Sequence, residues 1–200
     1  MRNTLRSYSL PLLLAGLVAG CATAAGRVAV PRDYFPAKAG YTWAYDVTSP
    51  DDSTPGLAVL RVLEANEQSA VYDNGAGPFT WKYDEHGVFR SGSGTYILRS
   101  PIEAGHRWAL LGEGEARIIA VDRSVETPAG AFEGCVVIRE RQEDLSMDWW
   151  VAPGVGTVLL ESWSHDGQET ALIARAVLRS FVREPQQLGP GKTEVEIIPP

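Results

Sequence analysis

The sequence predicts a mainly β protein, a single antiparallel, strongly curved sheet or half-barrel of about ten strands. Two segments, residues 41–47 and 79–84, alternate between apolar and polar side chains, as a strand does when one face is buried. Other short apolar segments follow in series, separated by turn residues such as Asp73-Asn74-Gly75. Short turns join neighbouring strands into hairpins, which favours an antiparallel order.

The first half of the sheet follows from these patterns. The strand at 41–47 turns its aromatic residues to one face. Residues 49–56 are rich in turn formers and predict a hairpin into a second strand at 57–65, which is apolar enough to contact protein on both faces. The other strands predicted in this half are 69–73, 79–84, 88–90 and 95–99.

Further strands are predicted in the second half. They cover residues 115–126, 134–142, 147–152, 157–164 and 169–182. Asp166-Gly167 favours a tight hairpin turn, so the last segment should pair back on the strand before it. A helical stripe, with Arg175 and Arg179 on another side, also fits that segment. The turn and the alternating apolar face of residues 172–178 favour a strand.

The start of the chain has the composition of a secretory signal. Arg2 and Arg6 precede an apolar run at residues 10–19. This run is shorter than the roughly 20 residues that a membrane-spanning helix needs. Small residues then precede Cys21, and this pattern resembles the lipobox of bacterial lipoproteins.

The lipobox resemblance implies that Cys21 becomes the first residue of the mature protein and carries acyl chains such as palmitate. More than one chain is needed for stable membrane attachment, since each buried methylene contributes about 0.8 kcal/mol. The next residue is Ala22 rather than an aspartate that favours inner-membrane retention, so we expect the periplasmic face of the outer membrane. An ordinary cleaved signal with an incidental cysteine is the alternative.

Four parts of the chain are therefore expected. They are a signal peptide at 1–20, a lipidated tether at 21–32, a β domain at 33–183 and a disordered tail at 184–200. The 180 residues left after removal of the signal suit a single domain with its own core.

The charge and the cysteines exclude several functions. The net charge is −7, or −9 without Arg2 and Arg6, which argues against nucleic acid and against a polybasic membrane-binding face. Cys135 has no intramolecular partner once Cys21 is acylated, so the fold does not depend on a disulfide. In its apolar surroundings Cys135 is expected to be a small buried hydrophobic residue.

The residues that could carry chemistry are few. The histidines are His86, His106 and His165, and the chain has no Gly-x-Ser-x-Gly motif. No His or Cys pair stands at zinc-ligand spacing, and no phosphate loop or dinucleotide fingerprint occurs. The sequence thus predicts no catalytic residue, no metal site, no cofactor and no enzyme activity. A hydrolase that uses His86 or His165 is the less favoured alternative.

Four motifs together resemble a group of uncharacterised bacterial envelope lipoproteins, over roughly residues 33 to 182. They are DYFP at 33–36, G-x2-W-x-Y at 40–45, TPAG-x-F-x-GC at 127–135 and APGVG at 152–156. The series of short strands is also similar to the open half-barrel of the periplasmic lipoprotein carriers, in which a curved sheet cups acyl chains. The helices that pack inside those carriers have no counterpart in this sequence, and fold alone does not fix function.

Two aromatic stripes are the candidate ligand-binding residues. They consist of Tyr41, Trp43, Tyr45, Phe79, Trp81 and Tyr83. On an open curved sheet these stripes would line an apolar groove, whereas in a filled domain they would form an ordinary aromatic core.

We therefore expect a lipid-anchored, non-enzymatic binding or assembly module, with a lipid or an envelope protein as partner. A structural subunit of an envelope complex is the alternative.

Overall fold

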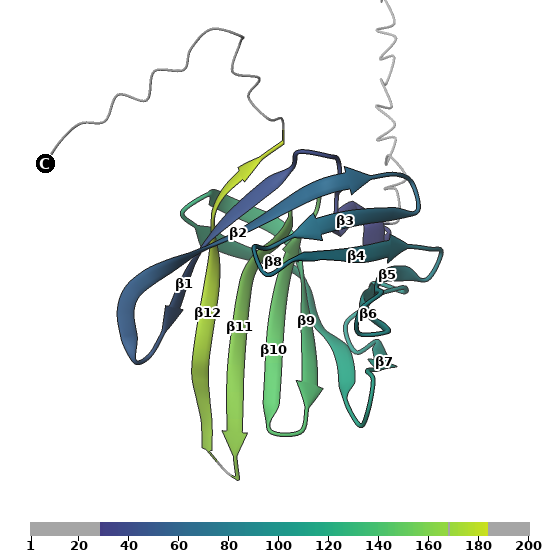
Figure 1. Ribbon diagram of the computed structural model, residues 1–200. Helices are drawn as coiled ribbons and strands as arrows, with labels where there is room; N and C mark the ends of the chain where they lie inside the picture. The colour runs from purple at the N-terminus through teal and green to yellow at the C-terminus, as the bar shows by residue number, and fades with distance from the viewer. Residues whose placement is uncertain (1–28, 168, 184–200) are drawn as a thin grey trace, which may run out of the picture.

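Twelve strands form one antiparallel sheet in the part of the chain that the computed structural model describes, residues 29–167 and 169–183 (Figure 1). The elements in chain order are η1 (Pro31–Tyr34), β1 (Thr42–Ser49), β2 (Asp52–Ala65), β3 (Ser69–Asp73), β4 (Pro78–Tyr83), β5 (Gly87–Arg90), β6 (Thr95–Arg99), β7 (Arg107–Ala109), β8 (Glu115–Thr127), β9 (Gly130–Gln142), β10 (Leu145–Ala152), β11 (Gly156–Asp166) and β12 (Glu169–Val182). The predicted fold class is confirmed.

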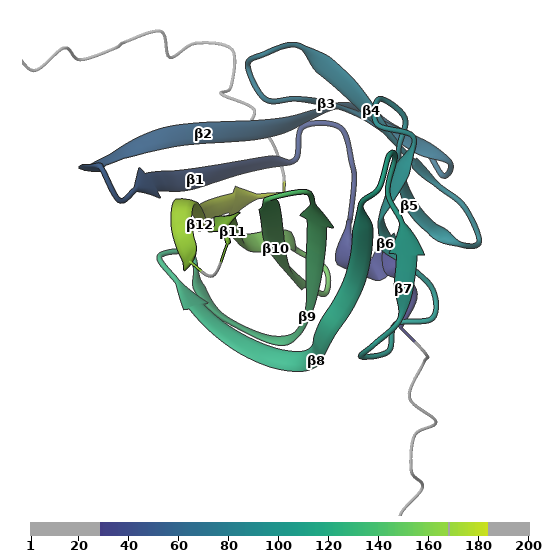
Figure 2. The same ribbon diagram turned by 90° about the horizontal axis from the view of Figure 1, so that it is seen from below.

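The strand order is β6-β5-β4-β3-β2-β1-β12-β11-β10-β9-β8-β7. Each half of the chain is a meander of hairpins, and the first strand joins the two halves by pairing with the last. The two edge strands, β6 and β7, follow each other in sequence. They also lie close in space, because the Trp108 indole Nε1 donates a hydrogen bond of 2.9 Å to the Tyr96 carbonyl oxygen. The sheet is therefore nearly closed, and Figure 2 shows it curling around an interior.

Bulges bend the long β8–β9 hairpin. Its register shifts between Ile118 and Val125, and Asp122 between them has a φ of 53°. Such irregularities increase the local bend of a strand. In Figure 2, β8 follows a long arc, and at the hairpin tip the Ala129 amide donates a hydrogen bond of 3.2 Å to the Leu178 carbonyl oxygen of β12.

The turn η1 packs against the interior from the N-terminal side. The Gly154 amide donates a hydrogen bond of 2.7 Å to the Asp33 carbonyl oxygen, and Tyr34 is buried. Phe35, directly after η1, meets the ring of Trp81 edge-on at 5.6 Å between centroids. Pro31 is buried too. The packed structure therefore includes residues before Asp33, and Asp33 is the residue at which the β domain was expected to start.

The last strand bears out the strand prediction for residues 169–182. β12 pairs with β11 from Glu169 onward and with β1 up to Val182, and Gly167 in the preceding turn has a φ of 59°. The helical alternative is wrong. A second expectation was also wrong, because β2 is not covered on both faces: Leu57 is 63% exposed and Leu63 is 45% exposed.

Candidate ligand-binding interior

The two aromatic stripes meet inside the curved sheet. Trp43 and Tyr45 of β1 and Trp81 and Tyr83 of β4 are buried, whereas Tyr41 and Phe79 are half-buried and pack against them. The ring of Trp43 stacks on Phe181 of β12 with 4.9 Å between centroids, and that of Tyr72 lies 4.3 Å from that of Trp81. The predicted residues therefore share one apolar interior, and their role in ligand binding stays a prediction.

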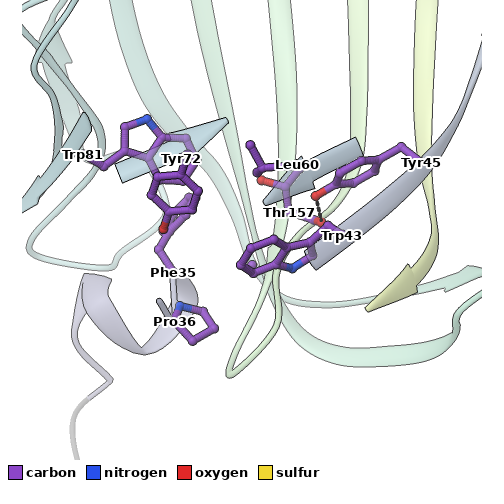
Figure 3. Close-up of a pocket in the computed structure, with 9 residues that line it drawn as sticks. Phe35, Pro36, Trp43, Tyr45, Leu60, Tyr72, Trp81 and Thr157 are labelled. Carbon is purple, nitrogen blue, oxygen red and sulfur yellow. Dashed lines mark hydrogen bonds between the residues drawn. The ribbon is translucent and has the colours of Figure 1, made fainter. Parts of the chain in front are cut away.

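One end of this interior is filled. The space between Phe35, Trp43, Tyr72 and Trp81, shown in Figure 3, has a volume of about 10 Å³, about the space of a single water molecule. In this part of the molecule the aromatic residues form a packed core.

Four aromatic side chains of the interior, those of Trp43, Tyr45, Tyr72 and Tyr83, have paired polar atoms. The Trp43 indole Nε1 donates to the Val155 carbonyl oxygen at 2.7 Å, and the Tyr45 hydroxyl donates to that of Thr157 at 3.0 Å. The Tyr72 and Tyr83 hydroxyls bond each other at 2.8 Å. Burial raises the pKa of Tyr45 and Tyr72, so these hydroxyls stay neutral. They orient the rings rather than carry charge.

A pocket of about 220 Å³ lies beside the packed end, and we call it the apolar pocket. It is lined by Tyr45, Ala58, Val59, Leu60, Asn74, Phe79, Trp81, Trp149, Thr157, Leu160 and Ala176. Strands from both halves of the chain contribute, so the pocket exists only because the sheet curls on itself. Its lining is almost wholly apolar, as is typical of sites for hydrophobic ligands.

A second pocket, of about 350 Å³, lies at the β9–β10 hairpin, and we call it the hairpin pocket. Its lining is Leu110, Glu140, Gln142, Glu143, Asp144, Leu145, Ser146, Met147, Ser162 and Ile173. Met147 stands two residues from Trp149 on β10, and Ser162 two residues from Leu160 on β11, so these pairs share one face of the sheet. The two pockets are therefore neighbours along the inner face of β10 and β11.

A buried ion pair lies where the pockets meet. Arg90 of β5 is opposite Trp81 in the ladder and so shares its inward face, and its Nη2 donates a hydrogen bond to Glu140 Oε1 of β9. The Glu140 side chain is 5% exposed and that of Arg90 is 22% exposed. The Arg90 guanidinium also lies over the Trp149 ring, 5.4 Å from its centroid. Trp149 lines the apolar pocket and Glu140 lines the hairpin pocket.

The electrostatics of this cluster are dominated by burial. Desolvation raises the pKa of Glu140, and the neighbouring Arg90 and Trp149 oppose the shift without cancelling it. Two buried donors of the cluster, Arg90 Nε and Trp149 Nε1, have no hydrogen bond of good geometry with any described residue. Unpaired buried donors are rare, and each calls for an explanation.

Sequence reasoning missed Arg90, Glu140 and Trp149. A charged residue in a strand normally faces solvent, so neither charge stood out. The available signal was the spacing of Glu140, which stands two residues after Ile138 and so faces inward with it.

The histidines considered for a hydrolase are in different settings. His86 is exposed, with Nε2 at 3.7 Å from Glu85 Oε1. His165 Nε2 is 2.8 Å from the Ser146 hydroxyl, and its Nδ1 is 3.1 Å from the Thr170 hydroxyl. A serine–histidine contact is one part of a nucleophile–base pair, but here a threonine occupies the place where a catalytic triad has a carboxylate. The prediction of no enzyme activity stays a prediction.

Other predicted features fall outside these pockets. Cys135 is fully buried, and burial raises the pKa of its thiol to about 11. Cys21 lies outside the described residues. Within residues 29–167 and 169–183, no three His, Cys, Asp or Glu side chains are grouped to hold a metal ion, and no helix is long and apolar enough to span a membrane.

Two solved structures share features of this fold. A protein described as exported, with a YmcC-like fold, from Bacteroides fragilis NCTC 9343 has a TM-score of 0.51 and 16% identity, over 74% of this chain and 98% of its own. A protein described as a lipoprotein, from Parabacteroides distasonis ATCC 8503, has a TM-score of 0.46 and 16% identity over the same shares. At this identity the first likeness shows the fold alone. No protein-family model and no curated protein matches the chain.

Proposed function

We propose that this protein is a non-enzymatic binding module for an elongated hydrophobic ligand, held at the periplasmic face of the outer membrane by acylated Cys21. The observation that carries the proposal is the apolar pocket, which has strands from both halves of the sheet as its walls and continues towards the hairpin pocket. Together the two pockets fall within the usual size of small-molecule sites, roughly 300–1,000 Å³.

The location rests on the lipobox pattern that ends at Cys21. A lipid anchor would hold the pocket close to a membrane surface, which is a source of long-chain ligands. The formal charge of −7 fits a protein that is attached by its acyl chains rather than by a basic surface.

Filling the apolar pocket tests binding directly. Ala176 lines it, so Ala176→Phe should displace a bound ligand, and we expect at least tenfold weaker binding of the neutral fluorescent probe N-phenyl-1-naphthylamine. The matched control is Ala171→Phe on the same strand, where the residue is exposed and outside the pocket lining. Equal binding by both variants and the unchanged protein would contradict the proposal.

The alternative, a structural subunit of an envelope complex, is favoured by one specific observation. Around Phe35, Trp43 and Trp81 the interior is packed to about 10 Å³ of free space, as in a domain that binds nothing inside. This alternative predicts that no probe enters the protein and that a protein partner co-purifies with it in a fixed ratio.

A further inference from the structure

The Arg90–Glu140 ion pair places two charges inside the curved sheet, where charged side chains are uncommon. An isolated pair in an apolar interior is weak evidence for stability, because desolvation of both ions opposes their attraction. A second ion pair, Arg139–Asp148, joins β9 to the neighbouring β10, with Arg139 Nη2 2.6 Å from Asp148 Oδ2. Asp148 precedes the inward-facing Trp149 and therefore points to the opposite, outer face. Arg90 is 22% exposed and Arg139 is 48% exposed, so the inner pair is the more desolvated of the two and its presence is the less explained by stability.

The inner cluster has more donors than acceptors. Glu140 accepts from Arg90 Nη2 and also interacts with the Trp149 indole N–H, while Arg90 Nε has no hydrogen-bond partner among the described residues. A guanidinium has five N–H donors in a planar fork that matches a carboxylate. An incoming carboxylate therefore meets donors that are already oriented, and it reaches Arg90 Nε without breaking a hydrogen bond.

We propose that the bound ligand is a long-chain fatty acid, with its hydrocarbon chain in the apolar pocket and its carboxylate on Arg90 and the Trp149 indole N–H. This inference rests on the proposed function, since it names the class of the hydrophobic ligand. Trp149 connects the two parts of the site, because its ring lines the apolar pocket and lies under the Arg90 guanidinium. The Arg90 side chain keeps 22% exposure and so remains within reach of a ligand.

Glu140 is the competitor of the ligand in this arrangement. It holds Arg90 while the pocket is empty and is itself almost completely buried. Two carboxylates next to one guanidinium repel each other, so a neutral side chain at this position favours the ligand. Burial already raises the pKa of Glu140, which is consistent with this role.

Dodecanoate and its methyl ester are the probes, because they share one chain and differ in the charge of the head group. For the unchanged protein we expect dodecanoate to bind at least about tenfold more tightly in calorimetric titration, which corresponds to about 1.4 kcal/mol. Glu140→Gln should bind dodecanoate several-fold more tightly still, so the ratio of the affinity for the acid to the affinity for the ester should rise.

The variant without both charges is designed to stay folded. Removing Arg90 alone leaves Glu140 buried without a partner, whereas replacing a buried pair by apolar residues is often neutral or stabilising. The double variant Arg90→Met/Glu140→Leu should therefore unfold no more easily than the unchanged protein and bind acid and ester equally. The control Arg139→Met/Asp148→Leu removes the outer pair and should keep the preference for the acid.

These outcomes distinguish a failure of the fatty-acid assignment from a failure of the proposed function. Equal affinity of the unchanged protein for acid and ester overturns the fatty-acid assignment and leaves the proposed hydrophobic pocket standing. Failure of Glu140→Gln to strengthen dodecanoate binding, or an unchanged preference in the inner double variant, also overturns it. If N-phenyl-1-naphthylamine fails to bind as well, the proposed function itself falls.

Discussion

The Arg90 guanidinium of β5 donates a hydrogen bond to the Glu140 carboxylate of β9 across the interior of the curved sheet. In the strand order β5 is near one end and β9 near the other, so only the curling of the sheet brings the two residues together. The contact lies beside both pockets, because Glu140 lines the hairpin pocket and Trp149, under the Arg90 guanidinium, lines the apolar pocket. The candidate site therefore depends on the same curling of the sheet that defines the fold.

The Glu140 carboxyl predicts a specific pH dependence of stability. Its pKa in the folded protein is raised above the ordinary 4.5, so the folded state binds this proton more tightly than the unfolded state does. The free energy of unfolding contributed by Glu140 then falls as pH rises from about the ordinary pKa through the raised one. Glu140→Gln has no carboxyl group to ionise here, so its free energy of unfolding does not fall in this way. Its stability relative to the unchanged protein should therefore increase with pH. Urea unfolding at several pH values measures this, and a constant difference would contradict it.

The contact between Trp108 and Tyr96 predicts how the sheet edges behave. Trp108→Phe removes the indole N–H and should cost about 1 kcal/mol, the typical net value of a hydrogen bond. Amide hydrogen exchange should become faster in β6 and β7 and stay unchanged in β10 and β11. Trp163→Phe is the matched control, because the buried Trp163 indole N–H has no hydrogen-bond partner among the described residues. Equal effects of both variants would mean that the edges are held by other contacts.

The buried Cys135 thiol predicts resistance to labelling. Its pKa of about 11 leaves almost no thiolate at neutral pH, and the side chain is fully covered. In a Cys21→Ser background, Cys135 is the remaining cysteine of the sequence. We expect no reaction with a thiol reagent such as dithionitrobenzoate in the native protein and complete reaction in denaturant. Rapid labelling of the native protein would show that this part of the core opens easily.

The lipid anchor is tested at Cys21. Cys21→Ser should abolish the incorporation of labelled palmitate and release the protein from the membrane fraction, because the acyl chains provide the attachment. If the serine variant still incorporates label and stays with the membrane, the anchoring prediction is wrong.

The contact between Ser146 and His165 tests the hydrolase alternative. We expect the unchanged protein and the His165→Ala variant to hydrolyse p-nitrophenyl butyrate at the same rate as buffer. A turnover that both Ser146→Ala and His165→Ala remove, with the fold intact by circular dichroism, would establish an enzyme at this position.

The fold was predictable because its signals are local. β12 followed from the Asp166-Gly167 turn and an alternating apolar pattern, and the bounds of β3 and β6 agree with residues 69–73 and 95–99. The bounds of β7 do not follow from alternation, since it has three residues and is positioned by the bond from Trp108 to the far edge of the sheet.

The site was less predictable than the fold. The aromatic stripes of β1 and β4 showed which faces are apolar, but not that one end of the interior is filled and the other is open. Arg90 and Glu140 are fifty residues apart in sequence. Their pairing depends on the number of strands between them and on the closure of the sheet, neither of which a local pattern contains.

Native mass spectrometry of residues 22–200, secreted without the lipidated cysteine, is the direct test of fatty-acid binding, since this segment includes every described strand. We expect a stoichiometric adduct with the mass of a long-chain fatty acid, which Ala176→Phe reduces and Ala171→Phe retains. If the protein shows only its own mass, both as purified and after fatty acids are added back, then it does not bind fatty acids, and the search turns to protein partners.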